Sequence, residues 1–247
     1  NRLEFYQQRL DARDVNYANH LYEVTGNSNI ENGVSFVELT TSSNQKTIRF
    51  TTDGTEPTLT STPYTNPIKI EKSVTIKAAA FNETSKISGV FEQTIRIHKA
   101  VGKKISFNVA PNEKYNAGGT SALINGIQGS DKRYGDKQWL GFDGKDVEIT
   151  IDLGEETEIN SITTRFNNQI GSWIYAPSQV IVSFPGTDEY LPIELEPSEE
   201  KIVDLKLETK IVTRFVKLKI LNPGIIADGK QGAGHLPWMF IDEIIIE

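Results

Sequence analysis

Two adjacent carboxylates, Asp242 and Glu243, and three separate histidines, His20, His98 and His235, are the residues whose types could support acid–base chemistry. The carboxylates lie in FIDEIIIE, which we predict to be a terminal strand. Successive side chains of a strand point to opposite faces, so the two carboxylates cannot flank one scissile bond. The sequence has no nucleophile elbow and no glycine-rich phosphate loop after a strand. We therefore expect this chain to carry no catalytic residues.

The segment NNQIGSWIYAP, which ends at Pro177, has the composition of a sugar-binding loop. An exposed aromatic ring such as Trp173 or Tyr175 matches the flat apolar face of a sugar, while polar neighbours recognise hydroxyl groups. The alternative is that Trp173 closes the end of a β-sandwich as a packing residue. The side chains predicted to supply the polar contacts are Asn167, Asn168 and Gln169.

Three further residues outside this loop have both a binding and a packing interpretation. His235, in GAGHLPW, is placed to hydrogen-bond a sugar hydroxyl, or it is simply a solvated loop histidine. Trp139 and Trp238 adjoin predicted strands, and Trp238 runs directly into an apolar segment. The family resemblance described below for residues 103–247 implies that both tryptophans are packing residues.

Composition limits the classes of protein and partner. The chain has 247 residues, enough for one or two domains, and no apolar run approaches the roughly 18 residues of a membrane span. The net charge of −7 argues against a nucleic-acid partner. Without cysteine, disulfides and thiolate metal sites are excluded. The chain begins with Asn1 and its only methionine is Met239, so we expect a piece of a longer protein.

The order of patterns predicts an all-β chain behind a short N-terminal helix. Residues 1–15 have helical spacing, 16–24 look extended, and Gly26-Asn27-Ser28 reads as a turn. From 29 to 98 all candidate strands are short, as in a fibronectin- or immunoglobulin-like sandwich. Residues 98–102 are a predicted linker, and 103–247 carries strands of a larger β domain. The runs DVEITIDL, QVIVSF and RFVKLKIL each place apolar side chains on one face.

The first β domain resembles a known accessory domain. Its TTDGTEPT run contains a turn at Asp53-Gly54, followed by Ser61-x-x-Tyr64, Pro67-Ile68 and the strand-like TIKAAA. This order resembles the C-terminal domain of bacterial chitobiases and β-hexosaminidases. Residues 1–28 are similar to the last helix and exit strand of a glycoside hydrolase family 20 barrel. The resemblance implies a parent β-N-acetylhexosaminidase whose catalytic domain, with its own Asp-Glu pair, lies upstream.

Residues 103–247 resemble the coagulation factor V/VIII discoidin domain, which includes carbohydrate-binding module family 32. The motifs that carry the resemblance are ALING (122–126), WLGF (139–142), IDLG (151–154), WI-x-x-P (173–177), RFVKL (214–218) and WMFIDEI (238–244). The resemblance implies a discoidin-type jelly roll that binds a glycan, with N-acetylhexosamine or galactose as candidate sugars. It also implies a bacterial protein that is secreted, periplasmic or at the cell surface.

The same resemblance implies a structural calcium ion near the start of this domain. Calcium takes six to eight oxygen ligands. The family pattern nominates Asn125, Ser130 and Asp131, with Glu243 from the last strand, although Glu243 facing solvent is an alternative. Asn125 stands where the family usually has Asp, and the glycine- and charge-rich insert 127–138 also departs from the pattern.

These observations predict a non-catalytic accessory region that binds a glycan or positions its parent enzyme. Two other functions stay open from the sequence. The domains can be structural spacers that bind no ligand, or a protein-adhesion module.

Overall fold

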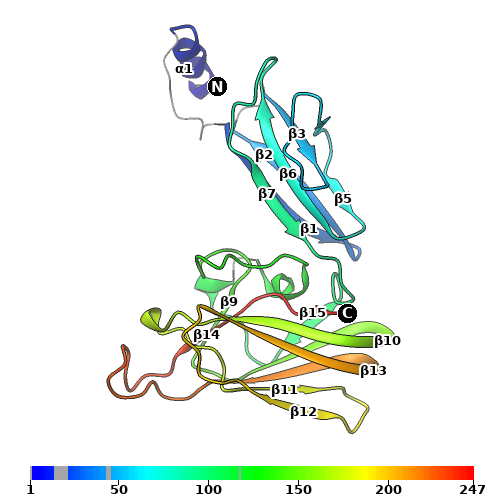
Figure 1. The fold of residues 1–247 in the computed structure, drawn as a ribbon, viewed down its shortest axis with the longest axis vertical. Coiled ribbons are helices and arrows are strands. Elements are labelled where there is room, and N and C mark those ends of the chain that lie inside the picture. Colours follow the sequence, from blue (N-terminus) through cyan, green and yellow to red (C-terminus); the bar gives the residue numbers. More distant parts are fainter. Residues whose placement is uncertain (1, 14–21, 43–45, 117) are drawn as a thin grey trace. The chain divides into compact units, whose positions relative to one another are not determined.

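The computed structural model describes residues 2–13, 22–42, 46–116 and 118–247. The chain divides into two compact units, Asn1–Ile95 and Arg96–Glu247. Both are built from antiparallel β-strands, which confirms the predicted all-β class (Figure 1). No described helix is long and apolar enough to cross a membrane.

Helix α1 (Arg2–Asp11) forms where the sequence predicts a helix, but it ends four residues before the predicted end. Phe5 and Tyr6 are exposed on it, and the Arg9 guanidinium lies 5.7 Å from the Phe5 ring centroid. The extended segment predicted at 16–24 and His20 fall almost entirely outside the described residues. The resemblance of this stretch to the end of a barrel stays a prediction.

The N-terminal unit contains two antiparallel sheets with an apolar interior. Val37, Ile76 and Ile95 are completely buried between them. One sheet has the order β1 (Val24–Glu31), β2 (Val34–Thr41), β5 (Ile68–Ile70), and the other has the order β4 (Thr62–Pro63), β3 (Thr47–Thr51), β6 (Val74–Phe81), β7 (Phe91–Ile95).

The predicted turn at Gly26-Asn27-Ser28 is wrong, because these residues lie inside β1 and pair with β2. The chain instead turns at Asn32-Gly33, where both residues have positive φ, as a two-residue hairpin requires. Gly26 serves packing: a Cβ there would lie 2.3 Å from the Phe91 ring. A glycine in a strand can thus mark a close approach rather than a turn.

The predicted turn at Asp53-Gly54 is confirmed, with Gly54 at a φ of +78°. The Asp53 carboxylate accepts hydrogen bonds from the backbone N–H and the hydroxyl of Thr55. This local contact lets a short polar side chain fix a turn. In β6, Ile76 is buried between the less buried Thr75 and Lys77, as an alternating strand requires, but Ala78, Ala79 and Ala80 are all buried, so both faces are covered at the end of the strand.

The C-terminal unit is organised around two long paired strands, β10 (Val147–Asn167) and β13 (Ile202–Leu221), labelled in Figure 1. Their register shifts between Asp152 and Thr157, so the two halves of β10 have different neighbours. The sheet has the order β12 (Tyr190–Glu194), β11 (Gln179–Ser183), β13, β10, β14 (Trp238–Ile241), β9 (Leu140–Asp143), and β8 (Lys104–Phe107) and β15 (Ile245–Ile246) also pair with β10.

The predicted alternation of this unit is confirmed in its core. The residues predicted to point inward are at most 1% exposed, while Lys217 and Lys219 are half-buried; the inward residues are Val147, Ile149, Ile151, Leu153, Val180, Val182, Phe184, Val216, Leu218 and Ile220. Trp139 is fully buried, as its packing interpretation required. Trp238 is only partly buried and packs against Trp139, Ile174 and Phe240.

The boundary between the units lies at Ile95/Arg96, earlier than the predicted linker. Residues 98–102 belong to the C-terminal unit. Ala100 is completely buried in its core, and the Lys99 N–H donates to the Ile246 carbonyl. Ala100 is small and His98 is polar, so the sequence alone does not distinguish this buried segment from an exposed linker.

The predicted terminal strand is interrupted. Residues 242–244 form a break between β14 and β15, and Asp242 and Glu243 at this break are both at most 1% exposed. Alternation to opposite faces is therefore not what separates them. Each carboxylate is buried against its own set of donors, described below.

Candidate functional site

A surface groove of about 690 Å³ lies in the C-terminal unit, where three loops meet. One loop follows β9, one follows the short 3₁₀ turn η4 (Ile170–Ser172), and one precedes β14. The lining residues are Asp143, Gly144, Lys145, Trp173, Ile225, Gly234, His235, Leu236 and Trp238.

Trp173 is the aromatic residue of this groove and is held by its backbone. It adopts a left-handed conformation, φ +62° and ψ +26°, at the end of η4. Its N–H donates to the Ile170 carbonyl, and its own carbonyl accepts the Trp238 N–H at 2.8 Å. A non-glycine residue in this region costs of order 1–3 kcal/mol and marks a position that the surrounding structure fixes. The two hydrogen bonds are what fix it here.

The indole of Trp173 lies against the loop that precedes β14. The ring stacks on the His235 imidazole, with centroids 5.2 Å apart and planes 19° apart. A Cβ on Gly232 would come within 2.7 Å of the indole, so the ring rests on bare backbone. Trp173 is partly buried, in the same range as Trp238, so its burial alone does not decide between the binding and the packing interpretation.

The remaining groove residues give it a polar side and an apolar side. Asp143 and Lys145 are exposed, and within the described residues neither forms an ion pair. Ile225 and Leu236 are 69% and 48% exposed, which is high for large apolar side chains. Flat rings, free polar groups and exposed apolar surface are the ingredients of a small-ligand site.

The other predicted ligand-binding residues lie outside this groove. The Asn168 amide donates to the carbonyls of Ser198 and Glu200 and accepts the Ala176 N–H, so it holds a loop. Asn167 is fully buried, and the Tyr175 hydroxyl is buried without a partner among the described residues. Asn168 and Gln169 border a separate depression of about 400 Å³. Of the six residues named from the sequence, the groove brings together Trp173 and His235.

Sequence reasoning missed four residues of the groove: Asp143, Lys145, Ile225 and Leu236. The turn at Asp143-Gly144-Lys145 was readable, with Gly144 at φ +61°. Its proximity to His235 was not readable, because it depends on the pairing of β9 with β14.

The segment 125–139 contains three of the residues nominated for calcium, Asn125, Ser130 and Asp131, and hydrogen bonds to its own side chains hold it. Asn125 accepts the Ile127 N–H and donates its amide to Gln138. The Asp136 carboxylate accepts the N–H groups of Ser130, Gln138 and Trp139. The polar side chains of Asn125 and Asp136 thus already have hydrogen-bond partners inside the loop.

Arg165, near the end of β10, contacts this loop with its guanidinium group. Its guanidinium donates to Asp242 at 2.6 and 2.9 Å, to the Gly129 carbonyl at 2.7 Å and to Asp131 at 2.9 Å. It also lies 5.4 Å from the Trp139 ring centroid. Burial raises the pKa of Asp242, against the opposing effect of Arg165. Arg165 and Asp242 therefore form a largely buried salt bridge, and each of the three guanidinium nitrogens of Arg165 donates to an acceptor.

Glu243 is buried by a different set of donors. Its carboxylate accepts the N–H of Gly126 at 2.8 Å, the N–H of Asn125 at 3.3 Å, and His98 Nε2 at 2.7 Å. The other His98 nitrogen, Nδ1, faces the N–H groups of Ala100 and Ile246. Nδ1 is therefore the acceptor and Nε2 carries the proton. Burial lowers the pKa of His98 to about 4 and raises that of Glu243.

The nominated calcium ligands fit an ion poorly in this arrangement. Asp131 is engaged by Arg165, Ser130 Oγ accepts the Lys132 N–H, and Glu243 is engaged by amides. Among the described residues, no cluster of three or more acidic, His or Cys side chains is arranged to hold a metal. Calcium at this loop stays a prediction from the resemblance alone.

Comparison with known proteins supports the first resemblance for part of the chain. Residues 28–92 match the family described as the chitobiase/beta-hexosaminidase C-terminal domain. A comparison with curated proteins gives no significant match.

Several solved structures are similar over about three-fifths of the chain. A fucose-binding module of Streptococcus pneumoniae has 12% identity and a TM-score of 0.41, covering 61% of this chain and 94% of its own. The lectin domain of lectinolysin, complexed with Lewis B antigen, has 13% identity and a TM-score of 0.41, covering 61% and 96%. Chitosan-binding module 1 of a Paenibacillus sp. IK-5 chitosanase/glucanase has 11% identity and a TM-score of 0.38, covering 62% and 99%. At these values the similarities assign no ligand to this chain.

Proposed function

We propose that the C-terminal unit binds a glycan in the groove lined by Trp173 and His235. The observation that carries the proposal is the half-exposed Trp173 ring, fixed by a left-handed backbone and stacked on His235 at the edge of the groove. The C–H face of a pyranose packs on such a ring, and burial of apolar area supplies the attraction.

Polar groups at the groove can read the sugar hydroxyls. Within the described residues, the His235 imidazole nitrogens have no hydrogen-bond partner, and Asp143 and Lys145 have no ion pair. An unpaired donor or acceptor at the surface can exchange water for a hydroxyl group at little cost. Exposed Ile225 and Leu236 suit a methyl substituent, so an N-acetylhexosamine is our first candidate sugar and galactose the second.

The biological setting is inferred from the resemblance. We propose that the chain is the accessory region of a bacterial β-N-acetylhexosaminidase that works outside the cytoplasm, with catalysis upstream. The match of residues 28–92 to a chitobiase-type C-terminal domain supports this setting. The burial of Asp242 and Glu243 against Arg165 and His98 supports a non-catalytic role for that pair.

A glycan array followed by calorimetry tests the proposal. The full chain should bind a defined set of glycans, and Trp173→Ala should abolish that set. Tyr190→Ala is the matched control, since Tyr190 is a 60% exposed aromatic outside the groove. Absence of any bound glycan, or equal loss in both variants, would favour a spacer or a protein-adhesion role.

A further inference from the structure

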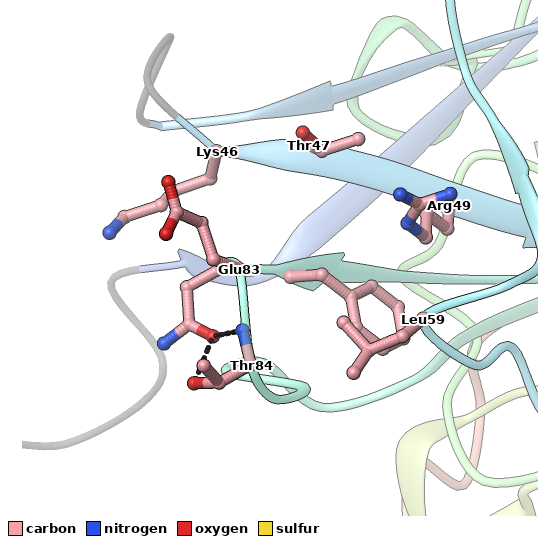
Figure 2. Close-up of a pocket in the computed structure, with 8 residues that line it drawn as sticks. Lys46, Thr47, Arg49, Leu59, Glu83 and Thr84 are labelled. Carbon is pink, nitrogen blue, oxygen red and sulfur yellow. Dashed lines mark hydrogen bonds between the residues drawn. The ribbon is translucent and has the colours of Figure 1, made fainter.

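A second depression, of about 700 Å³, lies in the N-terminal unit and is separate from the glycan groove. Figure 2 shows Lys46, Thr47 and Arg49 along one side and Thr84 on the other, with the Glu83 side chain directed toward the Lys46 side. The pairing of β3 with β6 brings these segments together, with Thr47 opposite Phe81. Ligand sites commonly have volumes of about 300–1,000 Å³, so a sugar unit fits here.

The charges of the depression are not neutralised by the protein. Lys46 and Arg49 face a single acid, Glu83. The described ion pairs of this unit use other lysines, namely Lys69, Lys77 and Lys86. Lys46 Nζ lies 5.3 Å from the Tyr22 ring centroid, a contact that positions the ammonium group and leaves its charge uncompensated.

Arg49 is both oriented and incompletely satisfied. One terminal nitrogen, Nη1, donates to the Ser61 carbonyl at 2.7 Å. The Nε donor is buried and has no acceptor among the described residues. Because Nε is closed off from solvent and Nη1 is engaged by Ser61, the remaining terminal nitrogen, Nη2, is the donor that Arg49 can offer to a ligand. A charge-assisted hydrogen bond from this fixed nitrogen suits an anionic acceptor.

The rest of the lining fits a sugar better than a free ion. Leu59 is 39% exposed and gives an apolar contact beside Arg49, and Thr47 and Thr84 provide hydroxyls. A polymeric phosphate backbone is disfavoured, because the chain as a whole carries a net charge of −7. These lining residues together favour a ligand that carries one anionic group on a compact polar ring.

We propose that the depression formed by Lys46, Arg49, Leu59 and Thr84 binds an acidic saccharide unit, a uronate or a sulfated hexosamine. Arg49 pairs with the anionic group, Lys46 contributes attraction and Leu59 packs against the ring. The site does not depend on the groove of the C-terminal unit. It would give the N-terminal unit a recognition role of its own.

Titration of the full chain, followed by NMR and calorimetry, tests the proposal. The probes are glucuronic acid against glucose, and N-acetylglucosamine 6-sulfate against N-acetylglucosamine, with inorganic sulfate as a separate arm. We expect saturable binding of the acidic probes at millimolar concentration or below, at least tenfold tighter than the neutral ones, and weaker in high salt.

Variants locate the binding site. Arg49→Gln should weaken acidic-sugar binding at least tenfold, Lys46→Gln by several-fold, and Lys69→Gln, an exposed lysine outside the depression, should change nothing. Trp173→Ala should leave the binding of glucuronic acid unchanged, and should remove only the binding of N-acetylglucosamine at the groove, which separates the two sites. If Arg49→Gln does not fold, Lys46→Gln and the map of shifted amides around β3 decide the outcome.

Three results would overturn the proposal. The first is equal affinity for acidic and neutral sugars. The second is undiminished binding in the variants of Lys46 and Arg49. The third is inorganic sulfate binding as tightly as the sulfated sugar, which would leave an anion site with no saccharide recognition.

Discussion

The groove at Trp173 and the loop at Arg165 are both built from polar and aromatic residues of the C-terminal unit, yet they differ in how those residues are used. In the loop, Arg165 donates to a carbonyl and two carboxylates, and Trp139 is fully buried beneath it. In the groove, the ring of Trp173 is half-exposed, and Asp143 and Lys145 have no ion pair within the described residues.

This difference separates two kinds of site that look alike in sequence. A buried charge must be paired, so a saturated cluster such as Asp242 with Arg165 holds the fold together. Polar groups that recognise a ligand must instead have hydrogen-bond donors or acceptors that no protein group occupies. This criterion motivates the proposal that Trp173 and His235 bind the ligand, and the expectation that Asp131 and Glu243 act as scaffold residues.

The largest expected effect is on folding, when the C-terminal unit is produced alone with its first residue at 96 or at 103. Residues 96–247 should fold, whereas 103–247 should be aggregated or molten. The shorter piece lacks Ala100 from the core and His98, which leaves Glu243 buried with one donor fewer. Calorimetry and amide NMR spectra of the two pieces test this. A cooperative melt of 103–247 similar to that of 96–247 would show that residues 98–102 are a linker after all.

The next effect compares a buried pair with an exposed one. Asp242→Asn should destabilise the protein by about 3–5 kcal/mol, because Arg165 keeps its charge in a largely buried position. Asp152→Asn is the matched control, since Asp152 forms a similar two-point contact with Arg214 at the surface. Water screens that pair, so its loss should change the unfolding midpoint little. Equal effects in urea unfolding would contradict the assignment of Asp242 to the scaffold.

The pH dependence of stability should report on His98. Burial holds its folded-state pKa at about 4, while the unfolded chain takes up the proton near the ordinary value of 6.5. The unfolded state thus binds more protons between these values, and stability should fall as the pH drops from 6.5 to 4. The loss is on the order of 3 kcal/mol.

His98→Gln isolates this contribution, because a glutamine amide can still donate to Glu243 but does not titrate. The variant should show a shallower loss of stability over the same pH range. Denaturant unfolding of both proteins at several pH values gives the difference. Identical slopes would mean that His98 is protonated in the folded state.

Part of this architecture could be read from the sequence because it depends on local patterns. Period-two alternation placed Ile149, Val182 and Leu218 in the core, and the Asp53-Gly54 turn depends on a contact two residues away. Trp173 was found because its polar neighbours mark a loop. The rest depends on distant partners. The Arg165–Asp242 pair spans 77 residues, and the glycine at position 26 of β1 is explained only by the ring of Phe91, which leaves no room for a Cβ.

A moderate effect is expected from the groove tryptophans. Trp173→Ala should weaken glycan binding by about 1–3 kcal/mol and lower the melting temperature little, since the ring packs on surface loops. Trp238→Ala should be more destabilising, because Trp238 packs edge-on against Tyr115 and contacts Phe240. It should also affect binding, since Trp238 lines the groove. A large drop in melting temperature for Trp173→Ala alone would make that ring a packing residue.

The smallest expected effect is that of calcium. Binding to the folded state alone would raise the melting temperature with calcium concentration. At the 125–139 loop, such binding requires Asp131 to leave Arg165 and Glu243 to leave the amides of Asn125 and Gly126. We therefore expect melts in chelator and in millimolar calcium to coincide for metal-free protein. A rise of several degrees that disappears in Asp131→Asn would show that the loop rearranges around the ion. Asp131 and Glu243 would then be metal ligands and not only residues that hold the fold together.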